Sequence, residues 1–115
     1  MKVFVYGTLK RGFCRHAALH QQTLLGTAVT EPHYQMVNVG TYPGLISAEP
    51  GVPVEGEVWE VDPTCLARLD EIESVTSELF HRRPVQLQAP FGQQPIEAYF
   101  FGGSTDGLPD CGTCW

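Results

Sequence analysis

The sequence predicts a single α+β domain built on a curled sheet of about six or seven strands with two helices. Two observations predict this class. At 115 residues and 43% hydrophobic content, the chain is long enough for one core and too short for two ordinary domains. The predicted strands mostly follow one another directly, which favours α+β over alternating βαβ layers. If such a sheet closes on itself, it loses its exposed edges.

The first half of the chain is divided by glycines into short segments. Gly7 ends an apolar, β-prone run and marks a turn directly after a buried strand. Gly12 and Gly26 bracket an alanine- and leucine-containing stretch that allows a short helix. The predicted elements, in order, are a strand at 3–6, a helix at about 15–25, and strands at 34–39 and 44–47.

The second half contains the best-specified helix. Asp62 can cap a helix, Pro63 fits the first helical position, and apolar residues then recur every three positions. In the strand before it, Gly56 indicates a bulge or a close backbone approach. The predicted elements are a strand at 54–61, a helix from 62, strands at 83–88 and 96–101, and a glycine-rich tail at 102–115.

Composition excludes several classes of function. The formal net charge is -6 with only seven Lys and Arg residues, so no basic stripe for nucleic acid is expected. No run of 18 or more apolar residues predicts a membrane span, and the first residues do not resemble a signal peptide. We therefore expect no nucleic acid or membrane partner and a cytoplasmic location.

The four cysteines are expected to be free thiols because nothing in the sequence indicates export. Cys111 and Cys114 have C-x-x-C spacing, but no second such pair supplies the four ligands of a zinc site. His16 and His20 are four residues apart without a third ligand and are read as surface residues. A mobile or folded-back tail is therefore expected, with no metal, while a thiol or zinc module at Cys111 and Cys114 stays an alternative.

One carboxylate of the predicted helix falls on its apolar side. With Leu66 at zero and about 100° per residue, Leu69 lies near -60° and Glu73 near -20° on a helical wheel, whereas Glu71 lies at about 140°. A carboxylate facing the core requires partners or a pocket, and desolvation raises its pKa toward that of a general acid/base. Alternatively, Glu73 curls into solvent or pairs with one of the arginines at 82 and 83.

The remaining acidic residues carry less functional signal. Glu55, Glu57 and Glu60 fall on one predicted strand, where a solvated face is the expected reading.

The turn Tyr6-Gly7-Thr8-Leu9 is a second candidate feature. Backbone N–H groups exposed after a buried strand can cradle a carboxylate or an oxyanion. The alternative is an ordinary turn in which Thr8 hydrogen-bonds its own backbone.

Four short motifs stand in the order and approximate spacing of a known family. Together they resemble the γ-glutamylcyclotransferase-like family over roughly residues 3–101, and the γ-glutamylamine cyclotransferases most closely. The motifs are Tyr6-Gly7-Thr8-Leu9, Tyr42-Pro43-Gly44-Leu45, Val54-Glu55-Gly56-Glu57-Val58-Trp59 and Leu69-Asp70-Glu71-Ile72-Glu73-Ser74, with Arg82 close behind.

The resemblance implies one domain over 1–115: a small mixed β-barrel of about six strands with two flanking helices. It implies an enzyme that cyclises a γ-glutamyl amine or amide to 5-oxoproline and releases the amine without a cofactor or metal. Glu73 matches the family's catalytic acid/base, and Tyr6, Gly7, Thr8 and Leu9 match its substrate loop. The expected partner is a small γ-glutamyl molecule, and the expected state is a monomer or weak homodimer.

One departure concerns substrate choice, because Phe80 stands where the family often has a tyrosine. A different class of function stays open as well, namely a non-catalytic barrel that binds a small amino-acid-like metabolite. The burial of Glu73 opposite the Gly7 turn discriminates between the two.

Overall fold

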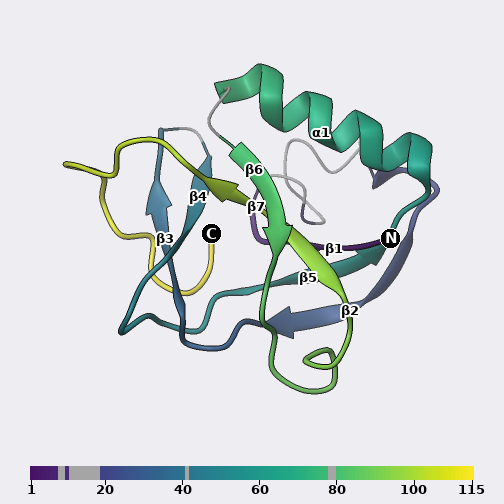
Figure 1. Cartoon of the computed structure of the whole chain (residues 1–115), viewed down its shortest axis with the longest axis horizontal. Helices are drawn as coiled ribbons and strands as arrows, with labels where there is room; N and C mark the ends of the chain where they lie inside the picture. The colour runs from purple at the N-terminus through teal and green to yellow at the C-terminus, as the bar shows by residue number, and fades with distance from the viewer. Residues whose placement is uncertain (8–9, 11–18, 41, 78–79) are drawn as a thin grey trace.

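The computed structural model describes residues 1–7, 10, 19–40, 42–77 and 80–115, and within these the side chains of 72–77 are outside the description. The described chain forms a mixed sheet of seven strands with one long helix lying across it (Figure 1). The elements are β1 (Lys2–Val5), β2 (Thr23–Val29), β3 (Tyr34–Asn38), β4 (Pro43–Ser47), β5 (Glu55–Glu60), α1 (Pro63–Ser77), β6 (Phe80–Pro84) and β7 (Ile96–Phe101).

The sheet is organised around β7. The hydrogen-bonded order is β2-β5-β1-β7-β4-β3, and β6 pairs with β7 in addition. Strand β6 pairs antiparallel with one edge of β7, from Glu97 to Phe101. Strands β1 and β4 therefore both pair with the opposite edge of β7. Parallel β1 pairs with the start of β7 at Ile96 and Glu97, and parallel β4 pairs near its end at Phe100. Two strands thus meet the same edge of β7 with a gap between them.

Tyr6 fills this gap. Its hydroxyl donates to the main-chain oxygen of Tyr99 in β7 at 2.6 Å and accepts from the main-chain N–H of Leu45 in β4 at 3.0 Å. Buried backbone groups are costly to leave unpaired, and here a side chain completes the pairing that no strand provides. Tyr6 therefore joins the end of β1 to both β7 and β4.

Both faces of the central strands are buried, as the two-residue period of a strand predicts. Phe4, Val58 and Phe100 point into one cluster, which also contains the β3 residue Met36. Their sequence neighbours point the other way, into a cluster that contains Leu69 of α1. These opposite neighbours are Val3, Val5, Trp59, Tyr99 and Phe101. Helix α1 therefore covers one face of the sheet, and the curl of the sheet encloses the other.

Several sequence predictions are confirmed. Five strands are found where the sequence predicted them, and each end lies within one residue of its prediction. The predicted ranges were 3–6, 34–39, 44–47, 54–61 and 96–101. The predicted close approach at Gly56 is also present, because a Cβ atom there would lie 2.4 Å from the carbonyl oxygen of Val5. No side chain other than hydrogen fits between β5 and β1 at this point.

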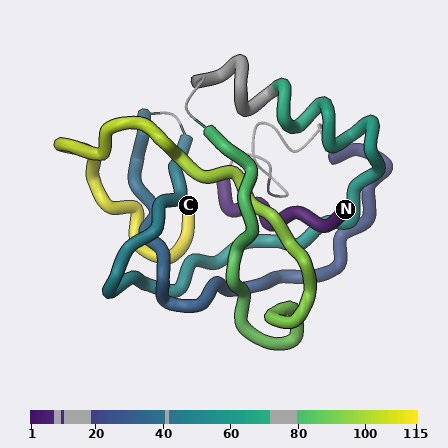
Figure 2. The backbone as a smooth tube through the Cα atoms, viewed as in Figure 1, coloured from purple at the N-terminus to yellow at the C-terminus, as the bar shows by residue number. Residues whose placement is uncertain are grey.

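The predicted closed barrel and second helix are wrong for the described chain. The sheet stays open with β2 and β3 at its ends, and the C-terminal segment covers the free edge of β3. Asn38 N–H donates to Pro109 O at 2.8 Å, and Cys111 N–H donates to Met36 O at 2.8 Å. Figure 2 shows this segment curling back beside β3. An edge paired with the tail is protected without closure.

The helix expected at about 15–25 is partly outside the described residues, since the description resumes at 19. From there on it is contradicted: Leu19 to Gln22 make a tight turn, and Thr23–Val29 is a strand paired with β5. A shift in the register between Leu24 and Gly26 accommodates Leu25 as an extra residue. Pairing with β5 has outweighed local helix propensity.

The strand predicted at 83–88 begins earlier, at Phe80, and its regular pairing ends at Pro84, which lacks the N–H that a ladder requires. Among the described residues, no helix is long and apolar enough to cross a membrane.

Candidate functional site

The turn after β1 is held against the start of β4. Gly7 is buried, and a Cβ atom on it would lie 2.7 and 2.9 Å from Cγ and Cδ of Pro43. Lys10 N–H donates to Gly7 O at 3.0 Å. Thr8 and Leu9, also predicted as substrate-loop residues, lie outside the described residues. The two described members of the predicted loop, Tyr6 and Gly7, are thus both fixed by β4.

Helix α1 begins at a well-formed cap. Asp62 Oδ1 accepts the main-chain N–H of Cys65 at 2.7 Å, as the sequence predicted. Gln22 also contacts Asp62, by accepting its main-chain N–H at 2.9 Å and donating to Oδ2 at 3.3 Å. The hydrogen bond from Cys65 and then the one from Gln22 lower the pKa of the Asp62 carboxyl below its usual value.

Glu73 belongs to the second half of α1, and its side chain lies outside the described part of the structure. The helix around it is oriented by described neighbours. Leu69 is fully buried against the sheet four residues earlier, and Asp70 contacts the sheet three residues earlier. Residues three and four apart share a helix face. The backbone position of Glu73 is therefore on the face of α1 turned toward the sheet.

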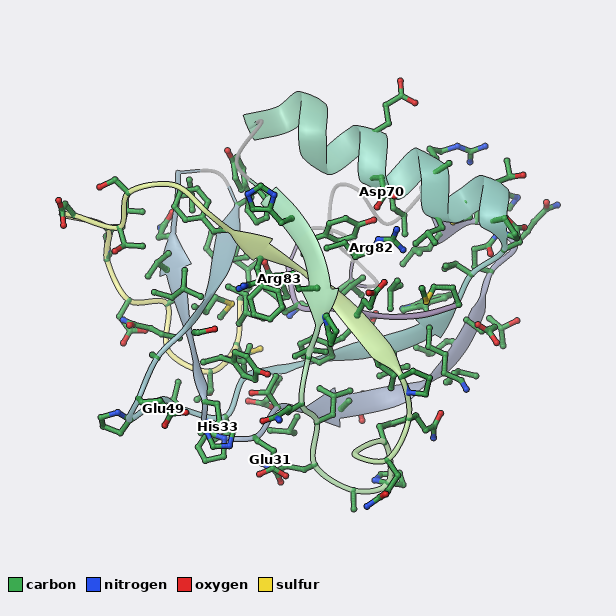
Figure 3. All side chains as sticks on the ribbon, viewed as in Figure 1. Glu31, His33, Glu49, Asp70, Arg82 and Arg83 are labelled. Atoms are coloured by element: carbon green, nitrogen blue, oxygen red, sulfur yellow. The ribbon has the colours of Figure 1, made fainter. Side chains whose placement is uncertain are left out.

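Asp70 is the centre of a polar group between α1 and the sheet. Its Oδ1 accepts the Tyr99 hydroxyl of β7 at 2.6 Å and lies 3.2 Å from Arg82 Nε of β6. Arg82 Nη1 lies 3.3 Å from Glu97 Oε1, an ion pair by distance that lacks hydrogen-bond geometry. Figure 3 shows Asp70 and Arg82 close together beneath the helix.

Arg83, which the sequence analysis offered as one partner of Glu73, is placed differently from Arg82. Its guanidinium carbon lies 4.6 Å from the centre of the Phe100 ring, a cation–π geometry.

Glu57 corrects one sequence prediction. It was read as part of a solvated face, but only 7% of it is exposed, and its Oε1 accepts the indole N–H of Trp59 at 3.1 Å. It lies opposite Val5 in the β1–β5 ladder and so next to the end of β1. Trp59, two residues on and on the same face, was the available sequence signal, because a buried indole N–H requires an acceptor.

The tail is folded back, which was one of its two predicted states. Glu55 N–H donates to Thr113 O at 2.7 Å, and Trp115 packs on the core cluster that contains Phe4. Buried Lys10 reaches the tail as well, with Nζ at 3.5 Å from Trp115 O and 3.8 Å from Cys114 Sγ.

Cys65, Cys111 and Cys114 form no disulfide bond. Burial, followed by the nearby Asp62 charge, raises the pKa of the Cys65 thiol. Burial, followed by the Asp110 charge, raises that of Cys111. No group of three or more His, Cys, Asp or Glu side chains within the described ranges is arranged to hold a metal ion.

The fold and the β1 turn define a class: small α+β proteins with an open mixed sheet, a glycine turn packed on β4, and a carboxylate-bearing helix. The chain belongs to the family described as gamma-glutamyl cyclotransferase, AIG2-like, whose model matches residues 3–113.

Relatives and solved structures agree with this assignment. A Vibrio cholerae protein named "Putative gamma-glutamylcyclotransferase" is 42% identical over 97 residues, covering 84% of this chain and 80% of its own. The solution structure of YtfP from Escherichia coli has a TM-score of 0.75 at 30% identity and covers 100% of this chain and 96% of its own. An AIG2-like protein from Mus musculus has a TM-score of 0.76 at 27% identity, covering 97% of this chain and 86% of its own.

Proposed function

We propose that this protein is a cyclotransferase that converts a γ-glutamyl amine or amide to 5-oxoproline and a free amine. Membership of the gamma-glutamyl cyclotransferase family carries the proposal. The local geometry supports it, because the residue before Gly7 and a residue one turn before Glu73 both hydrogen-bond to the same strand, β7. Tyr6 reaches the main-chain oxygen of Tyr99, and Asp70 reaches the Tyr99 hydroxyl.

In the proposed reaction, Glu73 acts as general acid/base. Its carboxylate accepts a proton from the substrate's neutral α-amine as the amine nitrogen attacks the γ-carbonyl carbon, which leaves the single N–H of the product lactam. The tetrahedral intermediate collapses as the bond to the leaving nitrogen breaks, and Glu73 returns the proton to that nitrogen. The attack is intramolecular, so correct folding of the glutamyl chain supplies much of the acceleration. No water is consumed.

The turn Tyr6, Gly7, Thr8 and Leu9 is proposed to bind the substrate. Main-chain N–H groups of this turn would hold the α-carboxylate or the oxyanion that develops on the γ-carbonyl. The contact between Gly7 and Pro43 supports this role, because it holds Gly7 against β4 before any ligand arrives. A preorganised donor does not have to be ordered during the reaction.

The finer assignment is a γ-glutamylamine substrate, and it rests on the motif resemblance. Phe80 is buried against Tyr42 and Phe101, with ring centroids 5.9 and 5.6 Å away. This position therefore offers an apolar ring where a hydroxyl is common among relatives.

The test is a screen of the purified protein against γ-glutamyl amines, γ-glutamyl amino acids and glutathione, with 5-oxoproline as the measured product. Glu73→Gln is expected to reduce kcat by roughly 10²–10⁴-fold, the usual contribution of a general acid/base. Glu71→Gln is the matched control, since Glu71 is exposed two residues earlier on α1, and its activity should equal that of the unmodified protein.

Equal activity in Glu73→Gln would overturn the mechanism. Silence of the unmodified protein across the whole panel, together with saturable binding of a γ-glutamyl compound by calorimetry, would favour the second candidate, a non-catalytic metabolite-binding protein.

A further inference from the structure

Three polar side chains from three elements form one connected group at the middle of α1. We call this group the α1 anchor: Tyr99 of β7, Asp70 of α1 and Arg82 of β6 (Figure 3). Asp70 Oδ1 accepts a hydrogen bond from the Tyr99 hydroxyl at 2.6 Å and forms an ion pair with Arg82 Nε at 3.2 Å. A single oxygen atom therefore contacts side chains of two neighbouring strands.

The anchor differs from an ordinary surface ion pair. Tyr99 is 5% exposed, and its hydrogen bond to a carboxylate is charge-assisted and short. Arg82 Nη1 lies 3.3 Å from Glu97, which restrains its guanidinium from a second side. Isolated exposed pairs leave their long side chains free to move, whereas here the tyrosine ring is fixed in the core.

The anchor also connects to the other half of the proposed site. The main-chain oxygen of Tyr99 accepts the Tyr6 hydroxyl, and Gly7 follows Tyr6 directly. Tyr99 thus contacts the segment before the Gly7 turn through its backbone and α1 through its side chain. One residue therefore contacts both halves of the proposed site.

Helix geometry links the position of Asp70 to the position of Glu73. Cys65, Leu66 and Leu69 of α1 lie in one apolar cluster with residues of the sheet, and apolar contacts are non-directional. The hydrogen bond between Tyr99 and Asp70, by contrast, restrains both the rotation of α1 about its axis and its translation along that axis. Glu73 starts three residues, or slightly less than one turn, after Asp70.

We propose that Tyr99, Asp70 and Arg82 are positioning residues that set Glu73 against the Gly7 turn. This inference rests on the proposed function for its kinetic consequence. A misplacement of about 1 Å can cost as much as roughly 10²-fold in rate, although the anchor itself touches no substrate.

The first test compares Tyr99→Phe and Asp70→Asn with Glu71→Gln as the exposed control. The two anchor variants should lower kcat by about tenfold or more, with KM changed by less than about twofold. Their double variant should lose no more than the worse single variant, because one connected group is removed only once. Rates are expressed per folded protein, with the folded fraction measured by circular dichroism at the assay temperature.

The second readout needs no activity. Amide hydrogen exchange should increase at residues 70–77 in both anchor variants, while exchange at 65–69 stays as in the unmodified protein. If the unmodified protein forms no 5-oxoproline, the proposed function fails, and this readout alone decides the positioning claim. Unchanged exchange at 70–77, or unchanged kcat in an active protein, would overturn the anchor as a positioning device.

Discussion

The contact between Gly7 and Pro43 gives the sharpest test of a single residue. Adding a Cβ at Gly7 creates contacts of 2.7 and 2.9 Å with the Pro43 ring, far inside normal packing distances. Gly7→Ala should therefore lower the free energy of unfolding by about 1–3 kcal/mol, the usual cost of overpacking. It should also raise KM, since the turn must shift away from β4. Urea denaturation and steady-state kinetics measure the two effects.

Pro43→Ala supplies the control for this interpretation, because it removes the two ring carbons that the new methyl group meets. The double variant should be more stable than the sum of the single effects predicts. Strict additivity would instead mean that the close approach to Pro43 is not what requires a glycine at position 7.

At the residue scale, the sequence singles out positions where the periodicity of a helix and the chemistry of a residue disagree. Glu73 stands out because a carboxylate falls on an apolar helix face. Tyr99 does not stand out, because its role depends on partners far along the chain, such as Tyr6 at 93 residues from Tyr99. No local pattern contains such a partner.

At the scale of elements, helix α1 depends on its Asp62 cap. The Asp62 carboxyl has a lowered pKa in the folded protein, so its contribution to stability is complete above its ordinary pKa of about 4. As the pH falls through the lower folded value, the carboxylate is protonated and the contribution is lost. Asp62→Ala should lower the Tm by several degrees at pH 7 and much less at pH 2–3.

Asp62→Asn is the matched variant, since asparagine caps helices but does not titrate. Thermal unfolding followed by circular dichroism from pH 2 to pH 7 should show a smaller acid-dependent loss of Tm for Asp62→Asn than for the unmodified protein. Parallel curves for the two proteins would show that other carboxylates dominate the acid response.

The same helix shows why some elements could be predicted and others could not. The start of α1 is encoded locally by Asp62 and Pro63, and the structure has it there. No residues within the β2 segment specify its secondary structure in this way. Its leucines and alanines suit a helix, and only pairing with β5, about 30 residues downstream, makes it a strand.

At the scale of the whole molecule, the open sheet and the folded-back tail are one feature. A barrel was predicted because closure removes edges, but the tail covers the β3 edge instead, through Val37 and Asp110. Glycine-rich composition made residues 102–115 look like an appendage. The sequence does not reveal that Trp115 packs on the core cluster around Phe4, because no nearby residue specifies that contact.

Removal of residues 109–115 should therefore destabilise the entire sheet, although it deletes no strand. The deletion breaks three main-chain hydrogen bonds, to Asn38, Met36 and Glu55, and uncovers apolar surface beneath Trp115. At about 0.5–1.5 kcal/mol for each bond, loss of the three bonds should lower the free energy of unfolding by about 1.5–4.5 kcal/mol. Trp115→Ala alone should cost about 1 kcal/mol, since its side chain is only partly buried.

Cys114→Ser, at an exposed position of the same segment, should change the urea midpoint little. If the deletion leaves the midpoint where Cys114→Ser leaves it, the tail is an appendage after all, and the β3 edge is stable without cover.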